Sequence, residues 1–129
     1  MYSQVNGMGL FGMNAFKVTA EIMSSRGQPS FDIVGLGDLA VQESRMRIKG
    51  ALSGIGISVS GQRLTVNLAP ADVRKCGSLY DFTIIAAILA VNNVITDDLS
   101  DCAFIGEVSL GGSLVFTGGI ISMAIEAKK

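Results

Sequence analysis

The stretch FDIVGLGDLAVQES, residues 31–44, marks the passage from a strand to a helix. Residues 31–34 are apolar enough for a short strand, and Asp38 is expected to be the N-cap residue of the helix. Between them, Gly35 and Gly37 have the spacing of a dinucleotide-binding turn. That fingerprint also needs an acidic residue about 20 positions later, and the end of the next strand, NLA, has none. The stretch therefore favours a tight strand-to-helix turn over a nucleotide site.

Strands are predicted on both sides of this turn. Residues 14–23 and 62–70 alternate apolar and polar side chains, which is typical of half-buried strands. Residues 103–116 predict a β-hairpin with a two-residue turn at Gly111 and Gly112.

Three helices are expected. Apolar residues recur at helical spacing after Asp38, and residues 82–91 are apolar nearly all round, so the second helix is expected to be buried. Ser78 and Asp81 fit a capping box at its start. A third helix is expected from Ile120. Together with the strands, these helices predict an α+β fold in which helices pack on a mixed sheet.

Length and composition limit the class of protein. A chain of 129 residues is long enough for one domain with a real core. Hydrophobic residues make up 49% and charged residues only 16%, so part of the surface is expected to face a partner. The longest apolar run, residues 84–91, is far shorter than the roughly 20 residues that span a bilayer. The start of the chain lacks the features of a secretory signal, and the cytoplasm is the expected location.

Several kinds of chemistry are excluded by residue type. The chain has no histidine and two distant cysteines, Cys76 and Cys102, so a structural zinc site and a histidine-based triad are not expected. No metal site and no cofactor are expected within these residues. The net charge of −1 argues against an autonomous nucleic-acid-binding domain, although a local basic patch is compatible with it.

Three segments carry a resemblance to a known family. They are PSFDIVGLGDLAVQESRMRIKGAL at residues 29–52, RLTVNLAPADVRKCGSLYD at 63–81 and FIGEVSLGGSL at 104–114. The chain resembles the N-terminal, ChlI-type domain of magnesium-chelatase-like AAA+ ATPases, the group that includes competence protein ComM. The resemblance implies a fold like the proteolytic domain of Lon protease and the second domain of a small-subunit ribosomal protein. One departure is Gly37, where the family usually has proline.

The same resemblance implies that residues 1–129 are a single domain of a longer AAA+ protein. The last helix runs to Lys129 without a capping residue, which favours this view, although a natural terminus would look the same. The ATP-binding P-loop, Gly-x-x-x-x-Gly-Lys-Ser/Thr, is absent here and lies further along in full-length family members. ATP and magnesium are therefore expected only for the full-length protein.

Peptidase activity is not expected. Lon-type proteases use a serine and a lysine, and the corresponding positions in this chain hold Leu79 and Ile121. By resemblance, the domain is instead expected to be a noncatalytic part of a hexameric motor for branch migration of DNA, where it supports assembly or substrate engagement. Its expected partners are the downstream AAA+ domain, neighbouring subunits and branched or single-stranded DNA. The alternatives are a stand-alone Lon-like peptidase acting through Ser78 and a DNA-binding module.

Basic residues form the candidate nucleic-acid site. Arg45 and Lys49 share one face of the first helix, and further basic residues are expected nearby. The competing interpretation is a solvated helix face that Glu43, paired with Arg47 four residues later, partly neutralises. The complete candidate set is Arg45, Arg47, Lys49, Arg63, Arg74 and Lys75.

Overall fold

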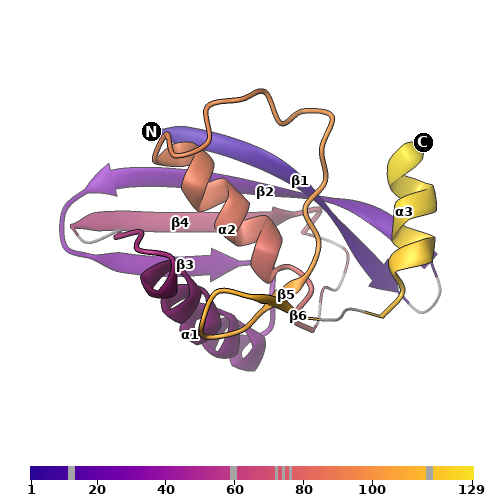
Figure 1. The fold of residues 1–129 in the computed structure, drawn as a ribbon, viewed down its shortest axis with the longest axis horizontal. Coiled ribbons are helices and arrows are strands. Elements are labelled where there is room, and N and C mark those ends of the chain that lie inside the picture. Colours follow the sequence, from indigo (N-terminus) through magenta and orange to yellow (C-terminus); the bar gives the residue numbers. More distant parts are fainter. Residues whose placement is uncertain (12–13, 59–60, 72, 74, 76, 116–117) are drawn as a thin grey trace.

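A four-stranded mixed sheet forms the centre of the molecule (Figure 1). The computed structural model describes residues 1–11, 14–58, 61–71, 73, 75, 77–115 and 118–129. In the strand order β1-β2-β4-β3, β2 is antiparallel to both β1 and β4, whereas β3 runs parallel to β4. The strands are β1 (Tyr2–Phe11), β2 (Asn14–Arg26), β3 (Ser30–Val34) and β4 (Gln62–Ala69). The predicted α+β class with a mixed sheet is confirmed, whereas β1 was not predicted.

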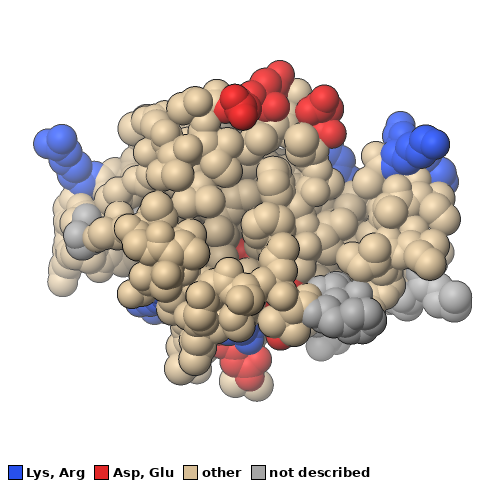
Figure 2. Space-filling view, viewed as in Figure 1, with Lys and Arg blue, Asp and Glu red and all other residues tan. Residues whose placement is uncertain are grey.

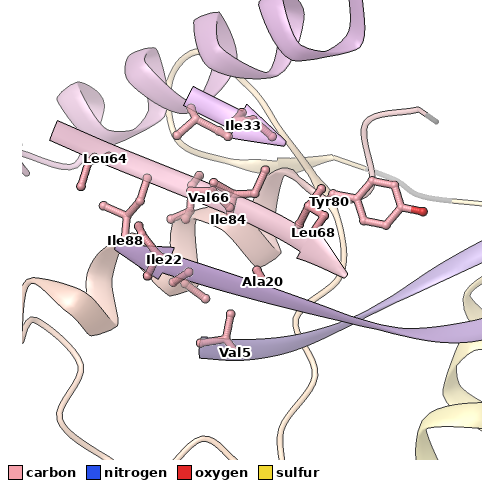
Figure 3. Packing of buried hydrophobic residues seen from close by; sticks show 14 of the residues in the cluster. Val5, Ala20, Ile22, Ile33, Leu64, Val66, Leu68, Tyr80, Ile84 and Ile88 are labelled. Atoms are coloured by element: carbon pink, nitrogen blue, oxygen red, sulfur yellow. The ribbon is translucent and has the colours of Figure 1, made fainter. Parts of the chain in front are cut away.

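Two helices cover one face of this sheet and enclose the core. They are α1 (Asp38–Gly54) and α2 (Asp81–Val91), and they contact each other. Alternate residues of β2 and β4, among them Ile22 and Val66, point toward Ile84 and Ile88 of α2 (Figure 3). All four side chains are fully buried, which confirms the alternation expected for these strands and the burial expected for the second helix.

The third helix, α3 (Ile120–Lys128), packs on β1 and β2 from the other face of the sheet. In β1, a Cβ atom at Gly7 would lie 2.5 Å from Thr83 of α2, so the odd-numbered positions face the core. Leu10 points to the opposite face, where it lies against Gly119 immediately before α3.

The predicted hairpin is present but shorter than expected. Its strands are β5 (Glu107–Val108) and β6 (Leu114–Val115), and residues 109–113 connect them. The amide of Ser109 donates a hydrogen bond of 2.8 Å to the carbonyl oxygen of Ser113, so the turn is wider than the predicted two residues. Glycine at position 112 is required because its φ is +94°.

Both predicted helix caps are wrong. Gly37, with an extended backbone, is the N-cap residue of α1, and Asp38 is the first helical residue, where its charge complements the helix dipole. The N-cap residue of α2 is Tyr80, and neither helix start has a side-chain cap hydrogen bond. The backbone oxygen of Ser78 accepts a hydrogen bond from the amide of Asp81. The side chain of Asp81 instead points to α1.

Among the described residues, every helix is too short or too polar to cross a lipid bilayer.

Candidate functional site

Three of the predicted basic residues lie at the same end of the sheet. Arg45 and Lys49 of α1 line a hollow of about 330 Å³ together with residues at the start of β3. Arg63, at the start of β4, is the Cα partner of Ser30 in β3, and Ser30 lines the same hollow. Lys and Arg side chains project from the left-hand end of the molecule in Figure 2. The structure therefore brings Arg45 and Lys49 together, whereas the side chain of Arg63 lies on the other face of the sheet, because the adjacent Leu64 faces the core.

A fourth basic residue, Arg26, belongs to this end and was missed. It is exposed at the last position of β2, one residue beyond the Ser25–Arg63 pair. The alternation that predicted β2 was followed only to residue 23, so the strand end was placed too early. We call Arg26, Arg45, Lys49 and Arg63 the basic end. Asp32 lines the hollow beside Arg45 and Lys49, and its negative charge offsets part of the positive charge of the basic end.

Two other members of the predicted patch have partners inside the protein. Arg47 forms an ion pair with Asp81, with 2.6 Å between Nε and Oδ2. Lys75 is only 3% exposed, and its Nζ donates hydrogen bonds to the backbone oxygens of Pro70 and Val73. Both cations are thus engaged by groups of the protein itself, and their predicted contact with DNA stays a prediction. The remaining member, Arg74, lies outside the described residues.

The ion pair of Arg47 is the centre of a buried polar cluster. Asp81 is fully buried, and its Oδ1 accepts a hydrogen bond of 2.9 Å from the hydroxyl of Ser44. Nη2 of Arg47 lies 3.2 Å from the same oxygen, and the amide of Val108 lies 3.4 Å from Oδ2. Hydrogen bonding to Asp81 holds the pKa of Arg47 above its ordinary value. The cluster joins α1, α2 and β5, which is a structural role.

A groove of about 700 Å³ lies beside Ser78, the serine of the peptidase alternative. Its lining includes the turn before α1, Lys75 and Ser78. The two residues that the resemblance equated with the Lon nucleophile and base do not line this groove: Leu79 packs against the core, and Ile121 is 77% exposed on α3. The amine of Lys75 is oriented by backbone carbonyls, an arrangement that holds the loop.

Acidic residues and cysteines do not assemble into a metal site within the part of the chain that the structure describes. Cys102 is a free, exposed cysteine. Partial desolvation of its thiol and the negative charge of the neighbouring Asp101 raise the pKa of that thiol.

Comparison with known proteins identifies a matching family and shows that the relatives are longer than this chain. The family described as subunit ChlI of Mg-chelatase matches residues 20–129. The protein YifB of Escherichia coli K12, which has no assigned function, is 38% identical over 128 residues, covering 98% of this chain and 25% of that protein. Competence protein ComM of Haemophilus influenzae is 36% identical over 119 residues, covering 92% of this chain and 23% of that protein. The chain thus spans about a quarter of the length of these curated relatives.

Proposed function

The chain belongs to the family of subunit ChlI of Mg-chelatase, among relatives of the ComM and YifB type, and from this premise we propose that it is a noncatalytic domain of a magnesium-chelatase-like AAA+ ATPase. In this proposal the domain supports assembly of a hexameric, cytoplasmic motor and its engagement of branched DNA. The ATPase domain lies in the rest of a longer protein and uses ATP and magnesium.

The single observation that carries the proposal is the match to proteins about four times as long. The chain aligns over nearly its whole length with about one quarter of each relative, which supports the proposal that it is one domain of a longer protein. The P-loop that an ATPase needs is absent from these 129 residues. An accessory role for the domain is consistent with both facts.

The side chains support a noncatalytic role. Leu79 and Ile121 carry no group that can act as a nucleophile or a base. Ser78 and Lys75 line a common groove, but the lysine amine is buried and donates to two backbone carbonyls. A lysine that acts as a general base must be deprotonated and must reach the serine hydroxyl. The amine of Lys75 donates hydrogen bonds to the carbonyl oxygens of Pro70 and Val73, which is a structural role.

We expect the longer protein, read from the coding sequence beyond Lys129, to hydrolyse ATP and to do so faster in the presence of forked DNA. A phosphate-release assay with and without fork measures this, and a P-loop lysine variant is the control. Absence of a P-loop from the longer reading frame would contradict the motor. Covalent labelling of Ser78 by a fluorophosphonate probe would contradict the noncatalytic assignment and support the peptidase alternative.

The basic end supports DNA engagement. Arg26, Arg63 and Lys49 are exposed at one end of the sheet and come from three different elements, with Arg63 on the opposite face from Lys49, so the proposed phosphate contacts run around this end. The proposal needs no sequence specificity, because phosphate contacts fix position without reading bases.

Replacing Lys49 and Arg63 with alanine in the longer protein is expected to weaken binding to forked DNA and to flatten its salt dependence. Each lost phosphate contact lowers the slope of log K against log salt by about 0.9. Fluorescence anisotropy over a salt series measures the slope. Lys17, which is exposed on β2 away from the basic end, provides the matched control Lys17→Ala. An unchanged slope in the double variant would remove the basic end from the DNA interface.

A further inference from the structure

The helix α3 is apolar on its outer side as well as its inner side. Met123 is fully buried on the side of the sheet. Ile121 and Ile125, one turn apart on the outer side, are 77% and 59% exposed. An amphipathic helix at the surface of a globular protein would carry polar residues there.

More apolar surface adjoins this stripe. Leu10 of β1 lies against Gly119, immediately before α3. Ile120 is 45% exposed. We call Ile120, Ile121 and Ile125 the α3 surface. Figure 1 shows that α3 stands at one end of the molecule beside β1 and β2, remote from α1 and α2.

A helix of this kind is expected to lie between two layers of structure. It has only nine residues, and helices of fewer than about 12 residues are marginal in water without tertiary packing. On its inner side the sheet provides that packing. Its outer side exposes large aliphatic side chains, which mark an interaction site when they are contiguous.

We propose that the α3 surface is the docking site for the segment that follows Lys129 in the longer protein. The inference rests on the proposed function, because it requires that the chain be one part of a longer protein. The curated relatives are about four times as long, so a large amount of additional chain is available to cover the surface. In this proposal that chain continues from the end of the same helix, so its effective concentration at the α3 surface is high. A separate partner or a second copy has no such advantage.

The occupant has a defined chemistry. The α3 surface is aliphatic, and the nearby charges Glu126 and Lys129 already pair with each other at 3.3 Å. The following segment is therefore expected to present an apolar face of its own, and burial of that face removes Ile121 and Ile125 from water.

Cysteine labelling in the longer protein tests the proposal. The variants are Ile121→Cys and Ile125→Cys, with Met46→Cys and Val94→Cys as controls at positions that are 70% and 53% exposed. Cys76 and Cys102 are replaced by serine throughout. The rate of maleimide labelling at each position is divided by its rate in denaturant. We expect positions 121 and 125 to react about ten-fold more slowly than positions 46 and 94, because labelling requires local opening.

The outcomes separate the two proposals. Equal rates at positions 121 and 46 in a protein that hydrolyses ATP would overturn the docking site and leave the motor intact. Protection at 121 in a protein without ATP hydrolysis would support the docking site and overturn the motor. Protection that disappears on about a hundred-fold dilution would assign the surface to a second copy and overturn the proposal. A reading frame that stops at Lys129 would overturn both.

Discussion

Replacing Arg47 with methionine is expected to lower the free energy of unfolding by about 3–5 kcal/mol, because the change leaves the fully buried carboxylate of Asp81 without its counter-charge. Methionine keeps most of the packing of the arginine stem, so the loss reports on the charge. Ser44 and the amide of Val108 continue to donate to Asp81, but two neutral donors do not replace a guanidinium held at 2.6 Å. Urea unfolding at an unchanged m value measures the difference.

Two further variants make this prediction specific. Removing both charges with Arg47→Met and Asp81→Asn is expected to recover part of the stability, because an unpaired buried charge costs more than a lost pair. Glu126→Ala breaks the exposed ion pair with Lys129 and is expected to change stability by less than about 1 kcal/mol. An Arg47→Met midpoint equal to that of Glu126→Ala would mean that the buried pair contributes nothing.

The role of Asp81 shows where sequence reasoning stopped. The capping box correctly indicated that a helix starts near residue 80, because caps and apolar runs are local signals. The partners of Asp81 are Ser44 and Arg47, which are 37 and 34 residues away along the chain. A local pattern cannot choose between a cap at Ser78 and a tertiary ion pair, since both place an acidic residue in the first turn.

The basic patch was predicted only as far as local sequence patterns reach. Arg45 and Lys49 are four residues apart on α1 and share a face, which helix geometry alone predicts. Arg47 lies two residues from each, about 200° around the helix, so it points away from them and toward α2. The period of the helix was thus sufficient to separate Arg47 from the patch. Arg63 was in the predicted set, but its position beside the end of β2, which adds Arg26, depends on the pairing of β2 with β4 that only the structure shows.

The strand β1 escaped prediction because of its glycines. In β2 and β4 apolar residues alternate with polar ones, but β1 has Gly7 and Gly9 at core-facing positions. A Cβ atom at Gly9 would lie 2.6 Å from the hydroxyl of Tyr80, so these positions are empty because the side chains behind them approach the strand closely. The alternation of apolar and polar side chains does not detect a strand that has glycine at its core-facing positions.

Replacing Gly35 with alanine is expected to lower the free energy of unfolding by about 2–4 kcal/mol, through backbone strain and a steric clash together. The φ of Gly35 is +106°, a conformation that L side chains rarely adopt. An added Cβ would also lie 2.7 Å from the backbone oxygen of Leu68 and 3.3 Å from Cε of Lys75. Neither the strand end nor the buried lysine can move away without disturbing the core. Denaturant unfolding measures the loss.

Gly37 provides the matched control within the same turn. Its φ of −67° suits any residue, and a Cβ added there would meet nothing within 4 Å. Gly37→Ala is therefore expected to change stability by less than about 1 kcal/mol, the cost of alanine at an N-cap position. If these glycines instead let the backbone approach a bound phosphate, alanine at either position would weaken ligand binding. It would leave the stability of the ligand-free protein unchanged. A large loss at Gly35 with little change at Gly37 would mean that the GLG turn is required by the close approach of β4 and the loop after it. Equal, small effects at both positions would contradict this and reopen the question of a ligand at the turn.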